Sequence, residues 1–134
     1  MGSQMPDKNI LVKIRRRKIY FPSTYNASDG DEFVVTRSAC NLYGLAIYTN
    51  EKWISVRDGL LNASVAMQRY LIAYSEYCLV KNDGIRISPV LMDVTELQRE
   101  AIWIPHANRV EIWNPKVDVQ CTRLIIDHAS GLLM

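Results

Sequence analysis

The chain has 134 residues, of which 49% are apolar and 22% charged, and its 16 Lys and Arg side chains face 14 Asp and Glu. This composition excludes a disordered protein, and at this length folding buries about two-thirds of the unfolded chain's surface, enough for a core without metals or disulfides. We find neither a run approaching the roughly 18 apolar residues of a membrane span nor a secretory signal, so we expect a cytoplasmic protein without a membrane partner. The three cysteines lie far apart, which fits a reducing compartment and predicts no metal site.

Positive charge is concentrated near the start of the chain. Residues 1–25 carry six basic side chains and one acid, Asp7, whereas the remainder is mildly acidic. At the centre of this segment stands the run Arg15-Arg16-Arg17-Lys18. Consecutive cations repel one another, and phosphate binding is the commonest reason for a fold to hold them on a rigid turn, which indicates a polyanionic partner. The alternative is a solvated charge run at the start of a strand.

The first third of the chain predicts strands followed by a helix. Residues 10–21 indicate a strand that the basic run interrupts and that ends at a proline, which cannot donate to a ladder. Residues 33–36 and 42–48 indicate two more strands. Asn50 is placed to cap a helix that begins at Glu51. The inner face of this helix is predicted to carry Trp53, Val56, Arg57 and Leu60.

The most regular helical pattern in the sequence covers residues 63–78. Apolar and aromatic side chains recur there at three- and four-residue spacing, which places them on one face of a helix. We interpret this face as core or subunit interface rather than as a ligand site. Its members are Met67, Tyr70, Leu71, Tyr74, Tyr77 and Cys78.

The pattern of the first strands then recurs. Residues 79–89 again predict strand, polar turn, strand and proline, and Ser88-Pro89 suits the N-cap and first residue of a short helix. Two further strands are predicted at 101–104 and 110–113. Pro22 and Pro89 lie 67 positions apart, half the chain length. The protein is therefore predicted to contain a duplicated β-rich unit with a helical connector between the copies.

The sequence of the last segment of the chain is compatible with more than one secondary structure. Its apolar side chains fit one face of a helix, although part of the segment could also form a strand. The side chains that share this face are Val117, Cys121, Leu124, Ile125 and His128.

These two units resemble the MraZ family of bacterial regulators of division and cell-wall genes. The family marks each of two tandem AbrB-like swapped-hairpin units with a turn of the form D-x-x-G-R, followed by an apolar strand and a proline. Residues 14–22 match the first turn and residues 81–89 the second. The ends of the units are matched by residues 46–53 and 110–114, so the resemblance covers about residues 8–120.

The chain departs from the family at the turns themselves. In the second copy Gly84 is kept, but Lys81 replaces the acid and Ile85 stands where the arginine is expected. In the first copy Arg17 takes the place of the glycine, and Lys18 preserves the basic position. Because a positive φ at Arg17 would cost of order 1 kcal/mol, we expect the first turn to be reshaped.

The resemblance implies an α+β, β-dominated fold in which the two AbrB-like units form a pseudo-symmetric barrel. We expect the first unit at residues 8–53, the connector at 54–75, the second unit at 76–118 and a C-terminal segment at 119–134. It also implies a ring-like homo-oligomer, here associating through apolar helix faces.

The implied function is that of a sequence-specific transcriptional regulator that binds double-stranded DNA at promoter direct repeats and associates with the nucleoid. The predicted DNA contacts are Arg15, Arg16, Arg17 and Lys18, with Lys81 and Arg86 as secondary candidates. A basic side chain on a tight turn can pair with guanine while its neighbours hold phosphates. The rival interpretation is an oligomeric scaffold of the same fold whose turns have lost specific DNA binding.

Catalysis finds little support in the sequence. Cys121 and His128 could share a helix face, but two helical turns separate them by roughly 10 Å, too far for a nucleophile and its base. His106 has no second ligand at metal spacing. No nucleotide-binding or hydrolase motif occurs, so we predict no catalytic residue, no metal and no cofactor.

Overall fold

The computed structural model describes residues 10–116, and these form a β-dominated α+β barrel. Its elements are β1 (Ile10–Arg15), β2 (Lys18–Tyr20), β3 (Glu32–Arg37), β4 (Gly44–Thr49), α1 (Asn50–Gly59), a 3₁₀ turn (Leu60–Asn62), α2 (Val65–Ile72), β5 (Glu76–Leu79), β6 (Gly84–Arg86), α3 (Pro89–Thr95), β7 (Glu100–Pro105) and β8 (Val110–Trp113). The fold class predicted from the sequence is confirmed, as are the strands expected at 33–36, 101–104 and 110–113.

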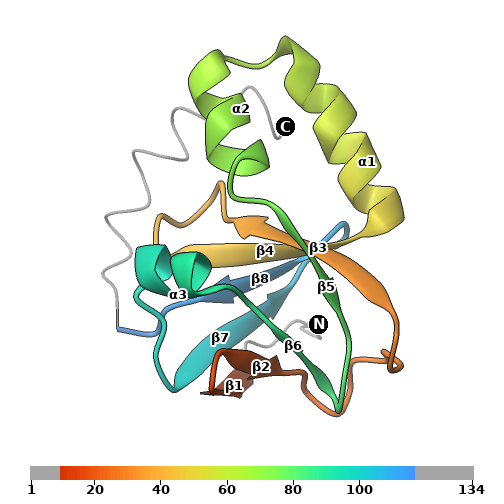
Figure 1. Cartoon of the computed structure of the whole chain (residues 1–134), viewed down its shortest axis with the longest axis vertical. Coiled ribbons are helices and arrows are strands. Elements are labelled where there is room, and N and C mark those ends of the chain that lie inside the picture. Colours follow the sequence, from red (N-terminus) through yellow and green to blue (C-terminus); the bar gives the residue numbers. More distant parts are fainter. Residues whose placement is uncertain (1–9, 117–134) are drawn as a thin grey trace, which may run out of the picture.

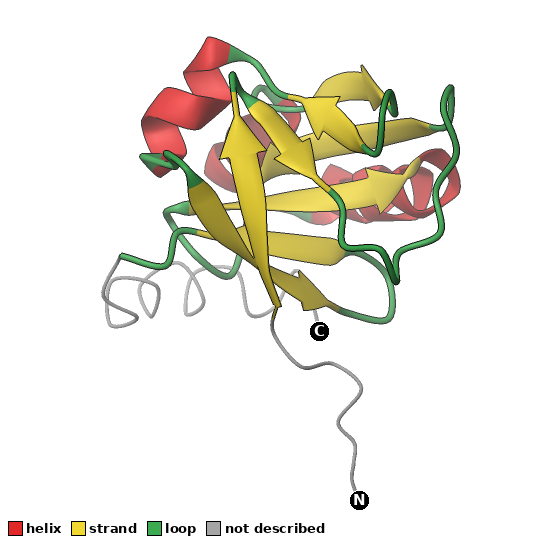
Figure 2. Ribbon diagram, turned by 90° about the horizontal axis from the view of Figure 1, so that it is seen from below, coloured by secondary structure: helices red, strands yellow, loops and turns green. Residues whose placement is uncertain are grey.

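The strands form one antiparallel sheet that nearly closes on itself. Their order is β5-β3-β4-β8-β7-β1-β2-β6, and the two outermost strands, β5 and β6, lie against each other. Figure 2 shows the strands wrapped around an interior with the helices outside. Inward-facing side chains from both halves fill that interior, among them Ile14, Ile19, Leu45, Ile85, Trp103 and Ile112. Figure 1 places α1 and α2 at one end of the molecule and the β1–β2 hairpin at the other.

The barrel has an internal two-fold relation between its halves. Strands β2 and β6 cross antiparallel with Ile19 opposite Ile85. The amide of Phe21 donates to the Asp83 carbonyl at 2.8 Å, and the amide of Ile87 donates to the Arg17 carbonyl at 2.9 Å. These two bonds exchange under a two-fold axis through the Ile19–Ile85 pair, so each half completes the sheet of the other.

The same axis passes between β4 and β8, where a buried carboxylate lies. Glu111 pairs with Ala46 across these strands and is fully buried. Its oxygens accept hydrogen bonds from Ser38 Oγ, from Trp113 Nε1 at 2.9 Å and from Arg109 Nε at 2.5 Å. A carboxylate is tolerated in the interior here because it is paired with Arg109 and both of its oxygens accept hydrogen bonds.

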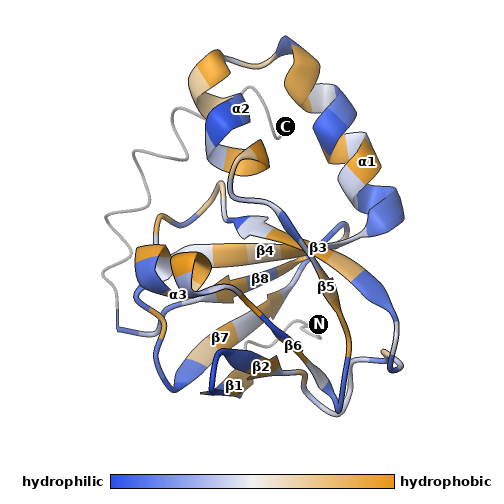
Figure 3. Cartoon of the chain, viewed as in Figure 1, coloured by the Kyte–Doolittle hydropathy of each residue, from blue (hydrophilic) through white to orange (hydrophobic). Residues whose placement is uncertain are grey.

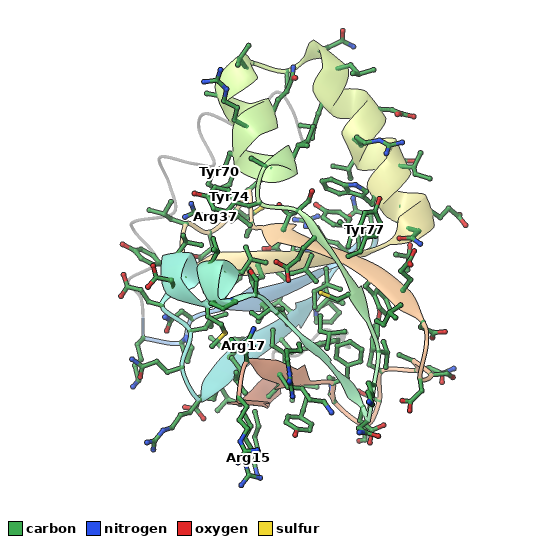
Figure 4. All side chains as sticks on the ribbon, in the orientation of Figure 1. Arg15, Arg17, Arg37, Tyr70, Tyr74 and Tyr77 are labelled. Atoms are coloured by element: carbon green, nitrogen blue, oxygen red, sulfur yellow. The ribbon has the colours of Figure 1, made fainter. Side chains whose placement is uncertain are left out.

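Helices α1 and α2 cover the outside of β3 and β4. Trp53 of α1 packs on Tyr48, with ring centroids 5.5 Å apart. The Arg37 guanidinium lies 4.7 Å from the ring centroid of Tyr70 and 5.0 Å from that of Tyr74, which fixes α2 against the end of β3. Figure 4 shows these three side chains gathered beneath α2.

Two details of α1 differ from the prediction. Thr49, not Asn50, is the N-cap, because its hydroxyl accepts from the Lys52 amide. Arg57 is exposed rather than on the inner face, since the helix packs through Trp53 and the 3₁₀ turn that follows it buries Leu60.

The second helix is shorter than predicted. It ends at Ile72, and Tyr77 and Cys78 lie in β5, where they pair with Val34 and Phe33 of β3. Tyr77 is consequently exposed instead of sharing a helix face with Tyr74. Because β3 needs a partner on its outer edge, sheet pairing overrides the helical spacing of this segment.

The start of α3 is as predicted. Ser88 is the N-cap, its hydroxyl accepting from the Leu91 amide at 3.2 Å, and Pro89 is the first helical residue. The helical face expected around Cys121 and His128 lies outside the described residues. Within residues 10–116, no helix is long and apolar enough to cross a membrane.

Removing the partner of the buried carboxylate should be costly. We expect Arg109→Leu to lower the free energy of unfolding by about 3 kcal/mol, because Glu111 is left buried without its counter-ion. Urea denaturation measures this change. Adding Glu111→Gln to Arg109→Leu should restore part of the loss, since a neutral amide no longer needs a cation. A double variant no more stable than Arg109→Leu would contradict the ion pair's role.

Candidate nucleic-acid interface

The basic run forms the turn of the β1–β2 hairpin. Arg15 pairs with Lys18 across the two strands, which leaves Arg16 and Arg17 as the two central residues of the turn. Their φ angles are 52° and 66°, the left-handed conformation that a two-residue I′ turn requires. Holding two non-glycine residues there costs of order 1 kcal/mol each, which marks the turn as a functional candidate.

The expectation that the first turn is reshaped is wrong. In the second turn Asn82 and Asp83 have the same φ pair, 52° and 66°, so the two turns share one backbone conformation. Asn and Asp suit this conformation, and arginine does not. The two copies therefore keep the same shape and differ in chemistry.

The structural register also corrects the alignment of the two motifs by one residue. Because Ile19 lies opposite Ile85 on the two-fold axis, Arg17 corresponds to Asp83 and Lys18 corresponds to Gly84. Gly84 thus occupies the basic position of the second turn, not its turn glycine. A Cβ on Gly84 would lie 2.4 Å from the Ile19 carbonyl oxygen, so close approach of the strands demands glycine.

The four cations of the first turn have different surroundings. Arg15 and Arg16 are exposed, and Figure 4 shows Arg15 extending away from the barrel. Arg17 is half-buried, and its Nη1 donates to the Ile87 carbonyl at 2.9 Å, so this side chain braces the turn against β6. Lys18 Nζ lies 4.9 Å from the ring centroid of Tyr20.

The structure brings Arg86 into this basic group and leaves Lys81 apart from it. Arg86 lies directly opposite Lys18 on β6, and two like charges in that position destabilise a sheet. Lys81 belongs to the second turn, at the other end of the β2–β6 pair. There Asp83 is its neighbour, and Asp29 accepts a hydrogen bond from the Asn82 amide at 3.0 Å. One end of the crossing is thus cationic and the other acidic.

Within residues 10–116 the only ion pair is between Arg109 and Glu111. The cations around the first turn are therefore unpaired in the described part of the chain and available to a polyanion.

Several curated proteins are similar to this chain, although no protein-family model matches it. One from Halothermothrix orenii is 27% identical over 106 residues, covering 74% of this chain and 73% of the relative. One from Alkaliphilus metalliredigens is 29% identical over 104 residues, covering 72% and 71%. One from Thermoanaerobacter pseudethanolicus is 25% identical over 107 residues, covering 75% and 73%. Each is named transcriptional regulator MraZ.

The chain is similar to MraZ regulators over about three quarters of its length. The resemblance stated from the turns and from the ends of the two units is thereby confirmed. With the corrected register, this chain has Ile14 and Val80 where the MraZ turn D-x-x-G-R has its acid, and both side chains are buried. Its basic position is filled in the first turn alone, by Lys18.

Two basic residues near the MraZ turn were not singled out from the sequence. Lys13 lies on the outer face of β1 with Arg15, as strand alternation alone could have indicated. Arg99 precedes β7, and its carbonyl accepts from the Ile14 amide at 2.8 Å. No local signal identifies Arg99, because only the pairing of β1 with β7 brings it to the hairpin.

The other reactive side chains are held in unreactive states. Burial, followed by the charge of Glu111, raises the pKa of the Cys40 thiol, and burial followed by Glu76 raises the pKa of Cys78 to about 12. Both thiols are therefore protonated at neutral pH. In residues 10–116 no three His, Cys, Asp or Glu side chains are grouped to hold a metal ion.

Relieving the strain in the basic turn should stabilise the fold. We expect Arg16→Asn to raise the free energy of unfolding by about 1 kcal/mol, because asparagine accepts a positive φ more readily than arginine. Chemical denaturation measures this gain. Arg15→Asn is the matched control, because it removes one cation from the same charge run at an exposed strand position. Equal effects of the two substitutions would show that charge repulsion, not backbone strain, is being relieved.

Proposed function

We propose that this protein is a transcriptional regulator that binds double-stranded DNA through its first turn. The observation that carries the proposal is the strained turn Arg16-Arg17. It holds cations that have no salt-bridge partner among residues 10–116, and Arg86 faces them from the other half. Left-handed arginines beside a like-charge pair are unfavourable for the isolated protein, and a polyanion compensates for this cost. The transcriptional role rests on the names of the MraZ relatives.

The residues of the turn divide the work of binding. Arg15 and Arg16 project into solvent and can reach base edges, where a guanidinium pairs bidentately with guanine. Lys18 and Arg86 supply phosphate contacts on the adjoining strands. Arg17 positions the turn through its bond to the Ile87 carbonyl. A regulator of this kind works on the chromosome, in the nucleoid.

One chain with so few contacts binds weakly, so the proposal includes a ring-like oligomer on direct repeats, in which linked turns raise the effective concentration. The helical end of the molecule offers apolar side chains for association: Ile54 (48% exposed), Leu61 (76%), Val65 (62%) and Ile72 (41%). Figure 3 shows apolar segments along both α1 and α2.

The rival function is an oligomeric scaffold of the same fold. The second turn favours it, since Gly84 carries no side chain at the basic position and Asp83 adds negative charge. Under this alternative the first turn also binds no specific DNA.

DNA binding is tested by fluorescence anisotropy on a duplex with short G-rich direct repeats and on a scrambled duplex. We expect Arg15→Gln/Arg16→Gln/Lys18→Gln to weaken binding to the repeats at least about 30-fold, since each lost contact contributes on the order of 1 kcal/mol. Arg69→Gln, which removes an exposed cation from α2, is the control and should leave the Kd within about twofold. If the unaltered protein binds neither duplex at low salt, DNA binding is rejected and the oligomeric scaffold remains as the function.

Association is tested by sedimentation velocity. We expect Leu61→Asp/Val65→Asp to reduce the oligomer to smaller species, because each buried apolar side chain contributes about 1.5–3 kcal/mol and an interface does not accommodate unpaired carboxylates. The control is Val90→Asp, which changes an exposed apolar side chain on α3. A ring that survives the first pair of substitutions and dissociates with Val90→Asp would move the interface to α3.

A further inference from the structure

A hollow of about 900 Å³ lies beside the first turn, between the β1–β2 hairpin and the segment that leads into β7. Residues from both halves of the chain line it. The side chains that matter are Lys13, Arg15, Arg16, Tyr20, Arg99 and Glu100.

The hollow is strongly cationic. Four of these six side chains are basic, and Glu100, the only acid among the lining residues, lies opposite Lys13 across β1 and β7. Arg15, Arg16 and Arg99 have no salt-bridge partner among residues 10–116. Three guanidinium groups around one depression repel one another in the absence of an anion.

The walls of the hollow are held in place by backbone bonds. The Ile14 amide donates to the Arg99 carbonyl at 2.8 Å, so Arg99 is tied to the strand that carries Arg15. On the other side, Arg17 fastens the turn to β6 through the Ile87 carbonyl. The backbone positions that carry these cations are therefore fixed before any ligand arrives.

We propose that this hollow binds the sugar-phosphate backbone of the DNA strand that crosses the first turn, with Arg99 and Lys13 as phosphate contacts. The inference rests on the proposed function and adds to it a contribution from the second half of the chain. Guanidinium groups match phosphate oxygens bidentately, and Tyr20 and Gln98 add neutral donors of the kind found at phosphate contacts. The hollow is open to the same solvent face as Arg15 and Arg16, so one strand can touch turn and hollow together.

A phosphate contact has a signature that a base contact lacks. It weakens binding to every sequence equally, and its loss reduces the slope of log K against log salt by about 0.9 per contact. We therefore expect Arg99→Gln to weaken binding to the repeat duplex and to the scrambled duplex by the same factor, roughly 3- to 10-fold for each subunit engaged on the DNA. The salt slope should fall by about one for each subunit engaged on the DNA.

Two variants make the measurement specific. Arg69→Gln changes charge equally but lies exposed on α2, at the other end of the molecule (Figure 1), and should leave the slope unchanged. Arg99→Lys keeps a cation at the hollow and should retain the slope. The thermal unfolding midpoint of Arg99→Gln should match that of the unaltered protein, because the Arg99 side chain is exposed and its structural bond comes from the backbone.

The outcomes separate this inference from the proposed function. Suppose that the triple variant of the first turn loses binding while Arg99→Gln has the same salt slope as Arg69→Gln. In that case the hollow does not bind DNA, and the proposal of a DNA-binding regulator is retained. A change in Arg99→Gln confined to the repeat duplex would overturn the phosphate assignment. The last measurement is calorimetric titration with inorganic phosphate. If phosphate binds more tightly than the duplex and this binding depends on Arg99, the hollow is a site for a free phosphate compound and the inference is overturned. If the unaltered protein binds neither duplex, both proposals fail.

Discussion

The antiparallel crossing of β2 and β6 is the constraint on which the rest of the molecule depends. Each strand has only three residues, yet each continues a hairpin of one half into the sheet of the other. The Ile19–Ile85 pair fills the centre of the crossing, and the bonds of Phe21 and Ile87 to the opposite turns lock its ends. Strands this short are not stable alone, so neither turn has a defined place without the other half.

This crossing explains why the two turns share a conformation although their sequences differ. Asn82-Asp83 adopts the left-handed pair readily, whereas Arg16-Arg17 is held in it by the hairpin pairing and by the Arg17 bond to the Ile87 carbonyl. The crossing also brings β2 and β6 close enough that only glycine fits at position 84. The basic side chain that the first turn presents is thus sterically excluded from the second.

Local patterns were sufficient to predict most strands and the cap at Ser88, because alternation and capping depend on neighbouring residues. They were insufficient where a distant partner decided the outcome. Tyr77 and Cys78 have helical spacing but extend the edge of β3. Aligning the two units on Pro22 and Pro89 shifts the motifs by one residue. The reason is that Pro22 follows the first turn one position sooner than Pro89 follows the second turn. At the candidate site, the basic run that begins at Arg15 can be identified from the sequence alone. Arg99 lies beside that run only because β1 pairs with β7.

The difference between the turns also bears on how DNA would be read under the proposed function. A barrel with two equivalent cationic turns has a two-fold symmetric binding face, and such a face matches inverted repeats. Here one end of the crossing carries Arg15, Arg16 and Lys18, and the other carries Asp29 and Asp83. The chain therefore offers DNA a face with a direction. Subunits related by rotation around a ring present that face in the same sense, so the repeats that suit them run head to tail.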